Sequence, residues 1–288
     1  MATTIAALLT CYNRREKTLA CLRELYAQEL PEGASISVFL VDDGSTDGTG
    51  DAVREAFPDV TVLQGTGTLF WVRALRLAFG EALKRDFDYY LWLNDDTYLY
   101  AGALKKMFST NQALAPEEVD RAIIAGNTCD PITGELTYGG LVRANSWHPI
   151  KFRRVTPGDV AKRCETQEGN CVLIPAAVAR AVGNVGSEFW HTLADIDYGL
   201  RAGQLGFSVW ITPGYIGTCV DDHPPRSQYR RLSFRDRWNK IVGPNGHPPR
   251  GWAAYCKRHA GPLWFFFFCR PYIKDVIVLF APGGQYFT

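Results

Sequence analysis

The 288-residue sequence predicts an α/β fold, in which helices flank a mostly parallel sheet and a helical, aromatic extension follows. Three observations support this. Short apolar runs alternate with segments of helical periodicity up to residue 98. Hydrophobic residues make up 47% of the chain, which is enough to bury a large core. Polar residues also follow several of the apolar runs directly, as at the carboxyl ends of parallel strands.

Four strands and three helices are expected before residue 94. The strands are predicted at 4–9, 36–41, 60–63 and 89–93. The helices are predicted at 14–30, in the segment that ends at residue 57, and at 69–83. Because strands and helices alternate, each helix carries the chain back and the strands should run parallel.

Charge and cysteine content exclude some classes of protein. The chain has 31 Lys and Arg residues against 30 Asp and Glu residues, so it lacks the basic excess that would indicate nucleic-acid binding. The eight cysteines form no Cys-x-x-Cys pair, which is typical of reduced thiols in a cytoplasmic protein. The opening MATTIAALLTCYNR has no basic residue before its apolar stretch, so we interpret it as a strand and not as a signal peptide.

Polar clusters follow the first, second and fourth predicted strands, and such loops gather at one edge of a parallel sheet. Any one cluster alone would be an ordinary polar turn. Together they contain Thr10, Tyr12, Arg14, Asp42, Ser45, Asn94, Asp95 and Asp96.

The chemistry of these clusters fits a nucleotide and a cation. Asp42 can accept the N–H of a pyrimidine base, Tyr12 can stack beside it, and Arg14 can reach a phosphate. Asp95 and Asp96 offer the hard oxygen ligands that Mg²⁺ or Mn²⁺ prefers. The segment GTGTLF lacks the Lys-Ser/Thr of a P-loop and the third glycine of a dinucleotide fingerprint, which disfavours an ATPase or a dehydrogenase.

At their spacings, LLTCYNR, FLVDDGSTDGT and YYLWLNDDTYL resemble the nucleotide-binding half of GT-A-fold glycosyltransferases of the large family-2 type. The segment from GTGTLF to LNDD is similar to a branch labelled rhamnosyltransferase-like. The resemblance covers about residues 4–225. It implies a Rossmann-like sheet, a nucleotide-sugar donor, a Mn²⁺ or Mg²⁺ ion and inversion at the anomeric carbon.

The resemblance also implies roles for particular residues. The family's Asp-x-Asp motif aligns with Asn94, Asp95 and Asp96, so an amide replaces the first acid. Asp96 is then the principal metal ligand, and Asp95 touches ribose or metal. His223 in CVDDHPP is either a second metal ligand or an ordinary loop residue beside two prolines. Thr10, Tyr12, Arg14, Asp42, Ser45, Asn94 and Asp95 are the expected nucleotide-binding residues.

A second segment is similar to the family's acceptor side, where GNCVLIP precedes a helix that begins with ADID. Asp195 is the predicted base that removes the proton of the acceptor hydroxyl. Asp197 is the second choice, with Arg201 as an ion-pair partner one turn on. Trp190 and His191 are expected to line the acceptor pocket or to belong to the core. On its own, ADID would be read as a capped helix start.

Three regions are predicted, a nucleotide-sugar-binding half at 1–98, an acceptor-binding half at 99–225 and a basic, aromatic extension at 226–288. The apolar segment at 261–280 is interrupted by charged residues and by Pro271, so no transmembrane helix is expected. Two alternatives remain for this segment. It lies at an anionic membrane surface, or it packs on the rest of the chain or on a second subunit.

The function predicted from the sequence is an inverting, metal-dependent transfer of a sugar from a UDP- or dTDP-sugar. The acceptor would be a saccharide or a lipid-linked saccharide, and the enzyme cytoplasmic, with a peripheral position at the inner face of a membrane as the alternative. Two other functions stay open. A sugar nucleotidyltransferase would share the acids, although LLTCYNRREK has no glycine-rich phosphate loop. A catalytically silent nucleotide-sugar-binding protein is suggested by Asn94.

Overall fold

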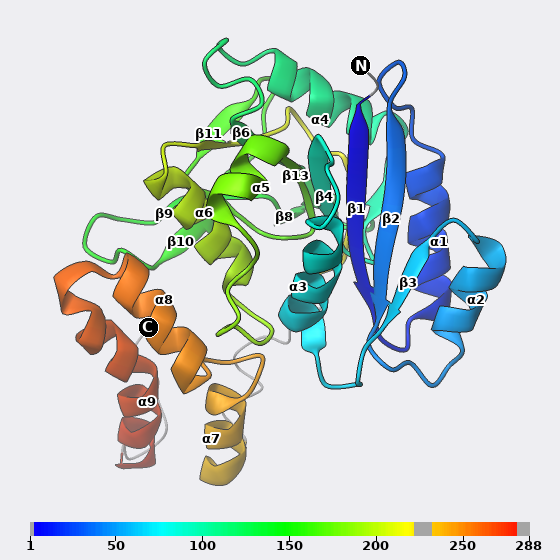
Figure 1. Ribbon diagram of the computed structural model, residues 1–288. Coiled ribbons are helices and arrows are strands. Elements are labelled where there is room, and N and C mark those ends of the chain that lie inside the picture. The colour runs from blue at the N-terminus through cyan, green and yellow to red at the C-terminus, as the bar shows by residue number, and fades with distance from the viewer. Residues whose placement is uncertain (1–2, 222–231, 281–288) are drawn as a thin grey trace.

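The computed structural model describes residues 3–221 and 232–280, and its centre is an eight-stranded sheet (Figure 1). The strand order is β11-β14-β6-β13-β4-β1-β2-β3. The pairs β1–β2, β1–β4, β2–β3 and β14–β6 are parallel, whereas β13 is antiparallel to both neighbours and β11 is antiparallel to β14. The strands are β1 (Thr4–Cys11), β2 (Ser35–Asp42), β3 (Thr61–Gln64), β4 (Tyr89–Leu93), β6 (Ala122–Ala125), β11 (Lys162–Cys164), β13 (Cys171–Pro175) and β14 (Ser208–Ile211).

Helices cover both faces of this sheet because its strands bury side chains on both sides. Along β1, Ala6 and Leu8 face one core, while Ile5, Ala7 and Leu9 face the other. The first core is completed by α3 (Phe70–Ala82), α5 (Ala176–Val182) and α6 (Ala194–Gln204). The second is completed by α1 (Arg15–Tyr26), α2 (Thr49–Ala56) and α4 (Ala103–Gln112).

These elements confirm the predicted α/β fold and the strand–helix order of the first 93 residues. The first strand runs two residues further than predicted, because Thr10 and Cys11 continue the ladder with Val41 and Asp42. The first helix ends at Tyr26, short of the predicted residue 30. Beyond it, the Gln28 side chain donates to the carbonyl oxygens of Glu24 and Tyr100.

Two small sheets extend the second half of the chain. One has the order β10-β9-β12, with β9 (Gly140–Arg143), β10 (Phe152–Arg154) and β12 (Thr166–Gln167). The other has the order β5-β15-β7-β8, with β5 (Tyr98–Leu99), β7 (Thr128–Cys129), β8 (Leu136–Tyr138) and β15 (Gly217–Thr218). The β9–β10 ribbon lies near α6, on the side of the molecule away from β3 (Figure 1).

The C-terminal helices pack onto the first core. They are α7 (Phe234–Val242), α8 (Pro249–His259) and α9 (Trp264–Phe280), with a 3₁₀ turn at Gly261–Leu263. Trp252 and Tyr255 of α8 and Phe267 of α9 are buried in the core shared with α3 and α6. The extension is therefore joined to the sheet domain by packing.

The exposed side of α9 is apolar as well. Phe265 and Phe266 are 61% and 63% exposed, although their neighbour Phe267 is buried. Within the described residues, no helix has the length and apolar character needed to cross a membrane. Helix α9 thus packs on the domain along one side and presents phenylalanines along another.

Candidate active site

The loops that follow β1 and β2 are tied together at the carboxyl end of the sheet. The ladder pairs Cys11 with Asp42. Beyond it, the Asn13 backbone N–H donates to Ser45 Oγ at 2.9 Å, and Asn13 Oδ1 accepts from the Thr46 N–H at 2.7 Å. Asn13 has a φ of +50°, a conformation that Asn tolerates better than most residues. Two of the predicted clusters therefore form one surface.

Asp42 is held in place within this surface. It is buried, and its Oδ1 accepts from the Ser45 N–H at 2.9 Å. Its Oδ2 lies against the first turn of α2, because a Cβ added at Gly50 would come within 2.3 Å of it. A helix N-terminus stabilises such a negative charge. Tyr12 is 51% exposed at the rim and is thus available to a ligand, and Thr10 is half-buried.

The neighbouring carboxylate, Asp43, has a structural task that the sequence analysis missed. It is buried and accepts three backbone hydrogen bonds, from Gly67 at 2.9 Å, Leu69 at 2.8 Å and Phe70 at 3.0 Å. These bonds fix the turn that leads into α3, where Phe70 has a φ of +56°. The doubled acid in VDDGS was the signal that could have indicated two separate roles.

The third cluster meets the first through an ion pair. Arg14 Nη1 lies 3.2 Å from Asp95 Oδ1 and 2.5 Å from Asp96 Oδ2. Thr18 of α1 also donates to Asp95 Oδ2 at 3.2 Å. Burial raises the pKa of Asp95 to about 6 even though Arg14 favours the charged form. Arg14 thus offsets the charge of two adjacent carboxylates at the end of β4.

These carboxylates fit a divalent cation that brings its other ligands with it. Within 3–221 and 232–280, no three His, Cys, Asp or Glu side chains are grouped to hold a metal ion. Mg²⁺ is commonly bound by one or two carboxylates, with substrate phosphates and water completing the shell. The Asp96 side chain is 17% exposed and that of Asp95 only 6%, so Asp96 is the more accessible ligand. His223 lies outside the described residues.

Asn94 connects β4 to α3 and to the loop before β13. Its Oδ1 accepts from Trp71 Nε1 at 2.8 Å, and its backbone N–H donates to the Asn170 carbonyl at 2.9 Å. Trp71 in turn packs against Gly169, where a Cβ would come within 2.4 Å of the indole ring. Nothing in the sequence spacing indicated Trp71, which is 23 residues from Asn94.

Asp195 lies on the other side of Gly169, in the first turn of α6. Its Oδ2 accepts from the Gly169 N–H at 3.0 Å, and its Oδ1 accepts from the Ile196 N–H at 2.9 Å. Burial raises its pKa, and these backbone hydrogen bonds oppose the rise. A carboxylate with a raised pKa is better suited to accept a proton. Trp71 and Gly169 therefore place this carboxylate close to the end of β4.

Asp197 has a different environment and is fully buried. Arg201 Nε donates to its Oδ2 at 2.8 Å, and Arg258 Nη1 and His259 Nε2 lie 3.0 and 2.9 Å from its Oδ1. The predicted pair with Arg201 is confirmed. Because three side chains already bind this carboxylate and none of it is exposed, Asp197 is disfavoured as the alternative base. It joins α6 to α8, a role that no local pattern indicated because the partners are 61 and 62 residues away.

Trp190 and His191 pack on the start of α3. The Trp71 N–H donates to His191 Nδ1 at 3.4 Å, and the Arg73 guanidinium lies 4.6 Å from the centre of the Trp190 ring. Phe70 contacts both aromatic rings edge-on. These two residues lie close to Trp71, and their contact with an acceptor remains a prediction.

One family model matches the first part of the chain. Residues 7–116, which include the three strand-end clusters, match the family model "Glycosyl transferase family 2". A search of curated proteins found no match.

Solved structures share the fold at low sequence identity. A mannosyltransferase from Pyrobaculum calidifontis, in complex with GDP-Man and Mn²⁺, has a TM-score of 0.54 and 18% identity, and the match covers 89% of this chain and 65% of that one. S. aureus TarS 1-349 has a TM-score of 0.51 and 14% identity, and the match covers 84% of this chain and 66% of that one. GalNAc-T7 with UDP, GalNAc and Mn²⁺ has a TM-score of 0.58 and 12% identity, and the match covers 93% of this chain and 54% of that one. The chain thus spans less than two thirds of the length of each.

Proposed function

We propose that this chain is an inverting glycosyltransferase that moves a sugar from a UDP- or dTDP-sugar to a saccharide or lipid-linked saccharide. One observation carries the proposal. A chain of contacts through Asn94, Trp71 and Gly169 runs from the end of β4, where Arg14 pairs with Asp95 and Asp96, to the Asp195 carboxylate. The family match over 7–116 and the nucleotide sugar, nucleotide and Mn²⁺ in two of the similar structures support it.

The donor nucleotide is proposed to bind along the loops after β1 and β2. Asp42 accepts the N–H of the base, while Tyr12 stacks on it from the exposed rim. Thr10, Ser45 and Asn94 offer hydroxyl or amide groups along the same edge, and Asp95 is near enough to contact the ribose. Arg14 is the cation available to the diphosphate, provided that its side chain turns away from Asp96.

A bound Mn²⁺ or Mg²⁺ ion would offset the negative charge of the leaving diphosphate. Asp96 is the proposed ligand, with Asp95 behind it and donor phosphate oxygens and water completing the coordination. Because Arg14 already offsets the charge of these carboxylates, the cation is expected to bind together with the donor.

Asp195 is proposed as the base for the acceptor. As the acceptor hydroxyl oxygen bonds to the anomeric carbon, Asp195 takes its proton and the bond to the diphosphate breaks on the opposite face. Attack from that face inverts the anomeric configuration. The hydrogen bonds from Gly169 and Ile196 hold the carboxylate in a fixed orientation for this step.

A silent nucleotide-sugar-binding protein is the second candidate, favoured by Asn94. Asn94 stands where the family that this sequence resembles carries an acid. Its side-chain oxygen accepts a hydrogen bond from Trp71. Such a protein would bind the nucleotide sugar and neither hydrolyse nor transfer it.

A peripheral position on an anionic membrane is also proposed, because α9 presents Phe265 and Phe266 to solvent. Exposed apolar groups of this kind usually have a partner. Nearby Lys257, Arg270 and Lys274 would attract anionic headgroups. A lipid-linked acceptor would be available at such a surface.

A thermal-shift screen of UDP, dTDP, GDP and CDP, each with and without Mn²⁺, tests the donor assignment. We expect a Mn²⁺-dependent increase in melting temperature with UDP or dTDP. Donor sugars carrying the nucleotide that responds are then assayed for hydrolysis and transfer. A response without turnover would favour the silent protein, and no response to any nucleotide would reject both functions.

A further inference from the structure

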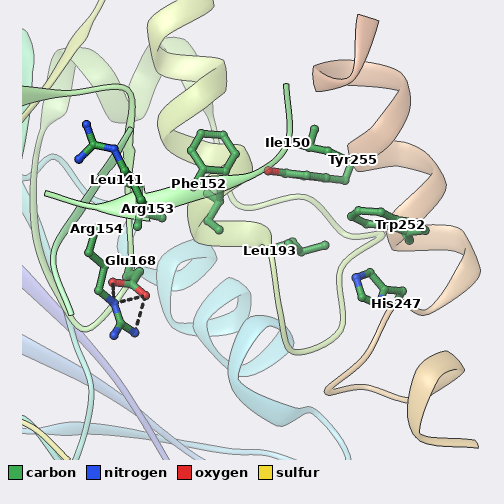
Figure 2. A pocket seen from close by; sticks show the side chains of 11 residues that line it. Leu141, Ile150, Phe152, Arg153, Arg154, Glu168, Leu193, His247, Trp252 and Tyr255 are labelled. Atoms are coloured by element: carbon green, nitrogen blue, oxygen red, sulfur yellow. Dashed lines mark hydrogen bonds and ion pairs between the residues drawn. The ribbon is translucent and has the colours of Figure 1, made fainter. Parts of the chain in front are cut away.

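A cavity lies outside the proposed donor site, between the three-stranded sheet, the start of α6 and helix α8 (Figure 2). Its volume is about 330 Å³, at the lower end of the roughly 300–1,000 Å³ typical of small-molecule sites. Most of its lining is apolar or aromatic. Its lining includes Phe152, Glu168, Leu193, Trp252 and Tyr255.

The wall contributed by α8 is held firmly. Asp197 of α6 binds both Arg258 and His259 at the end of α8. Trp252 Nε1 donates to the Phe268 carbonyl at 3.1 Å, which joins α8 to α9. Buried ion pairs and hydrogen bonds with defined partners resist displacement, so the cavity is a preformed feature of the fold.

One end of the cavity is polar. Glu168 receives two hydrogen bonds of 3.0 Å from Arg154, one from Nε and one from Nη2 (Figure 2). Arg154 also pairs with Asp221 at 3.2 Å. Burial raises the pKa of Glu168 to about 7. A carboxyl group with this environment can accept or donate a hydrogen bond near neutral pH.

Tyr255 provides a second polar group, and it lacks a partner. The residue is only 1% exposed, and its hydroxyl points into the cavity (Figure 2). No hydrogen bond to this hydroxyl is found within the described part of the chain. A hydroxyl can both donate and accept a hydrogen bond, so a ligand in the cavity could pair with it.

The cavity shares a wall with the proposed base. Glu168 precedes Gly169, whose N–H binds Asp195. Leu193 and Ile196 line the cavity and stand on either side of Asp195 in the sequence. A molecule in the cavity would therefore contact residues that flank the proposed base and its hydrogen-bond donor Gly169.

We propose that this cavity binds one pyranose ring of the acceptor saccharide. The inference rests on the proposed glycosyltransferase function and adds that the C-terminal extension builds part of the acceptor site. Apolar ring faces suit Phe152 and Trp252, and ring hydroxyls would pair with Tyr255 and Glu168. An acyl chain would offer the Tyr255 hydroxyl no hydrogen-bonding group, whereas a sugar hydroxyl can pair with it, so a sugar is the better occupant.

Saturation-transfer NMR on the full chain tests the proposal with three probes, the methyl glycosides of α-rhamnose, β-glucose and β-galactose. The variant Tyr255→Phe keeps the ring and removes the hydroxyl. Tyr198→Phe is the matched control, because Tyr198 is also fully buried with an unpartnered hydroxyl but packs against Trp92 in the core. Glu168→Gln tests the other polar end of the cavity.

At least one glycoside should bind the wild type and Tyr198→Phe equally, with or without UDP and Mn²⁺. Tyr255→Phe should weaken that binding roughly threefold to tenfold, the effect of one hydrogen bond. Its melting temperature should equal or exceed that of the wild type, because no partnered group is lost. Failure of all three glycosides to bind, or unchanged affinity in both Tyr255→Phe and Glu168→Gln, would overturn the proposal.

The nucleotide screen separates this result from the proposed function. If Tyr255→Phe loses glycoside binding and keeps the wild-type nucleotide response, the cavity and the donor site are distinct, as proposed. Glycoside binding without any nucleotide response would reject the glycosyltransferase function and leave the sugar site standing. A nucleotide response without glycoside binding would reject the cavity alone.

Discussion

Arg14 places its Nη1 atom 2.5 Å from the Oδ2 of Asp96, across 82 residues of sequence. The same nitrogen contacts Asp95, so one guanidinium serves both carboxylates of the proposed metal site. A cation at the proposed site would compete with Arg14 for these oxygens. The nucleotide-free state is therefore expected to have a low affinity for metal ions.

Replacing Arg14 tests this competition. Arg14→Gln should tighten Mn²⁺ binding to the nucleotide-free protein, because both carboxylates lose their counter-charge. Without metal the variant should melt at a lower temperature than the wild type, since the buried Asp95 carboxylate loses its ion-pair partner. Isothermal calorimetry with Mn²⁺ and thermal melts measure the two effects. Arg54→Gln, which breaks an exposed pair with Asp51, is the control, and weaker Mn²⁺ binding in Arg14→Gln would contradict the competition.

Asp195→Asn is expected to lower the rate of transfer by roughly a hundredfold to ten-thousandfold, the range found for general bases. The amide cannot take up the proton of the acceptor hydroxyl. Its remaining carbonyl oxygen can still accept the Gly169 hydrogen bond, so nucleotide affinity should stay within about threefold of the wild type. Turnover assays measure the rate of transfer, and calorimetry measures the nucleotide affinity. Wild-type turnover in this variant would remove Asp195 from the role.

Asp197→Asn should destabilise the protein strongly. Arg201, Arg258 and His259 all contact this fully buried carboxylate, and removing one charge from a buried cluster costs about 3–5 kcal/mol. Urea unfolding measures the loss. The control is Asp51→Asn on the surface of α2, because the Asp51 side chain is 92% exposed and should contribute little. Equal stability of the two variants would show that Asp197 does not anchor α8.

Much of the fold could be predicted because its signals are local. The strands β1, β2 and β4 appear as apolar runs, and the polar residues at their ends lie at the same edge because parallel strands end there. The contacts between Asp197 and α8, and between Trp71 and Asn94, could not be predicted in this way. The residues in these contacts are far apart in the sequence, and their spacing matches no helix or strand repeat. Only the packing of the folded chain brings them together.

The C-terminal region shows the same limit. Its composition indicated a basic and aromatic segment, but composition does not tell which phenylalanines are buried. Phe267 enters the core, while Phe265 and Phe266, the two residues before it, are exposed. That difference depends on how α9 is rotated against α8, which only the three-dimensional contacts determine.

The exposed phenylalanines predict binding to anionic vesicles. Changing Phe265 and Phe266 together to Ser should weaken binding to phosphatidylglycerol vesicles by about tenfold or more, because two large apolar groups can no longer enter the interface. Co-sedimentation measures the bound fraction, with phosphatidylcholine vesicles as the neutral comparison. Ile132→Ser, at a side chain that is 92% exposed in a distant turn, should leave binding unchanged. If the wild-type chain does not sediment with anionic vesicles, the membrane proposal is rejected.

Gly169 connects the two halves of the site, so adding one methyl group there should affect both. In Gly169→Ala the new Cβ would lie 2.4 Å from the Trp71 ring, which must move and thereby strain its hydrogen bond to Asn94. Overpacking of this kind costs about 1–3 kcal/mol, and nucleotide binding should weaken as the end of β4 shifts. Gly203→Ala in α6 is the matched control, because no atom lies within 4 Å of the added Cβ and alanine favours the helix. Urea unfolding should show the control as stable as the wild type or more stable. Equal stability and nucleotide affinity in Gly169→Ala would mean that the contact between Trp71 and Gly169 does not hold the two halves of the site in place.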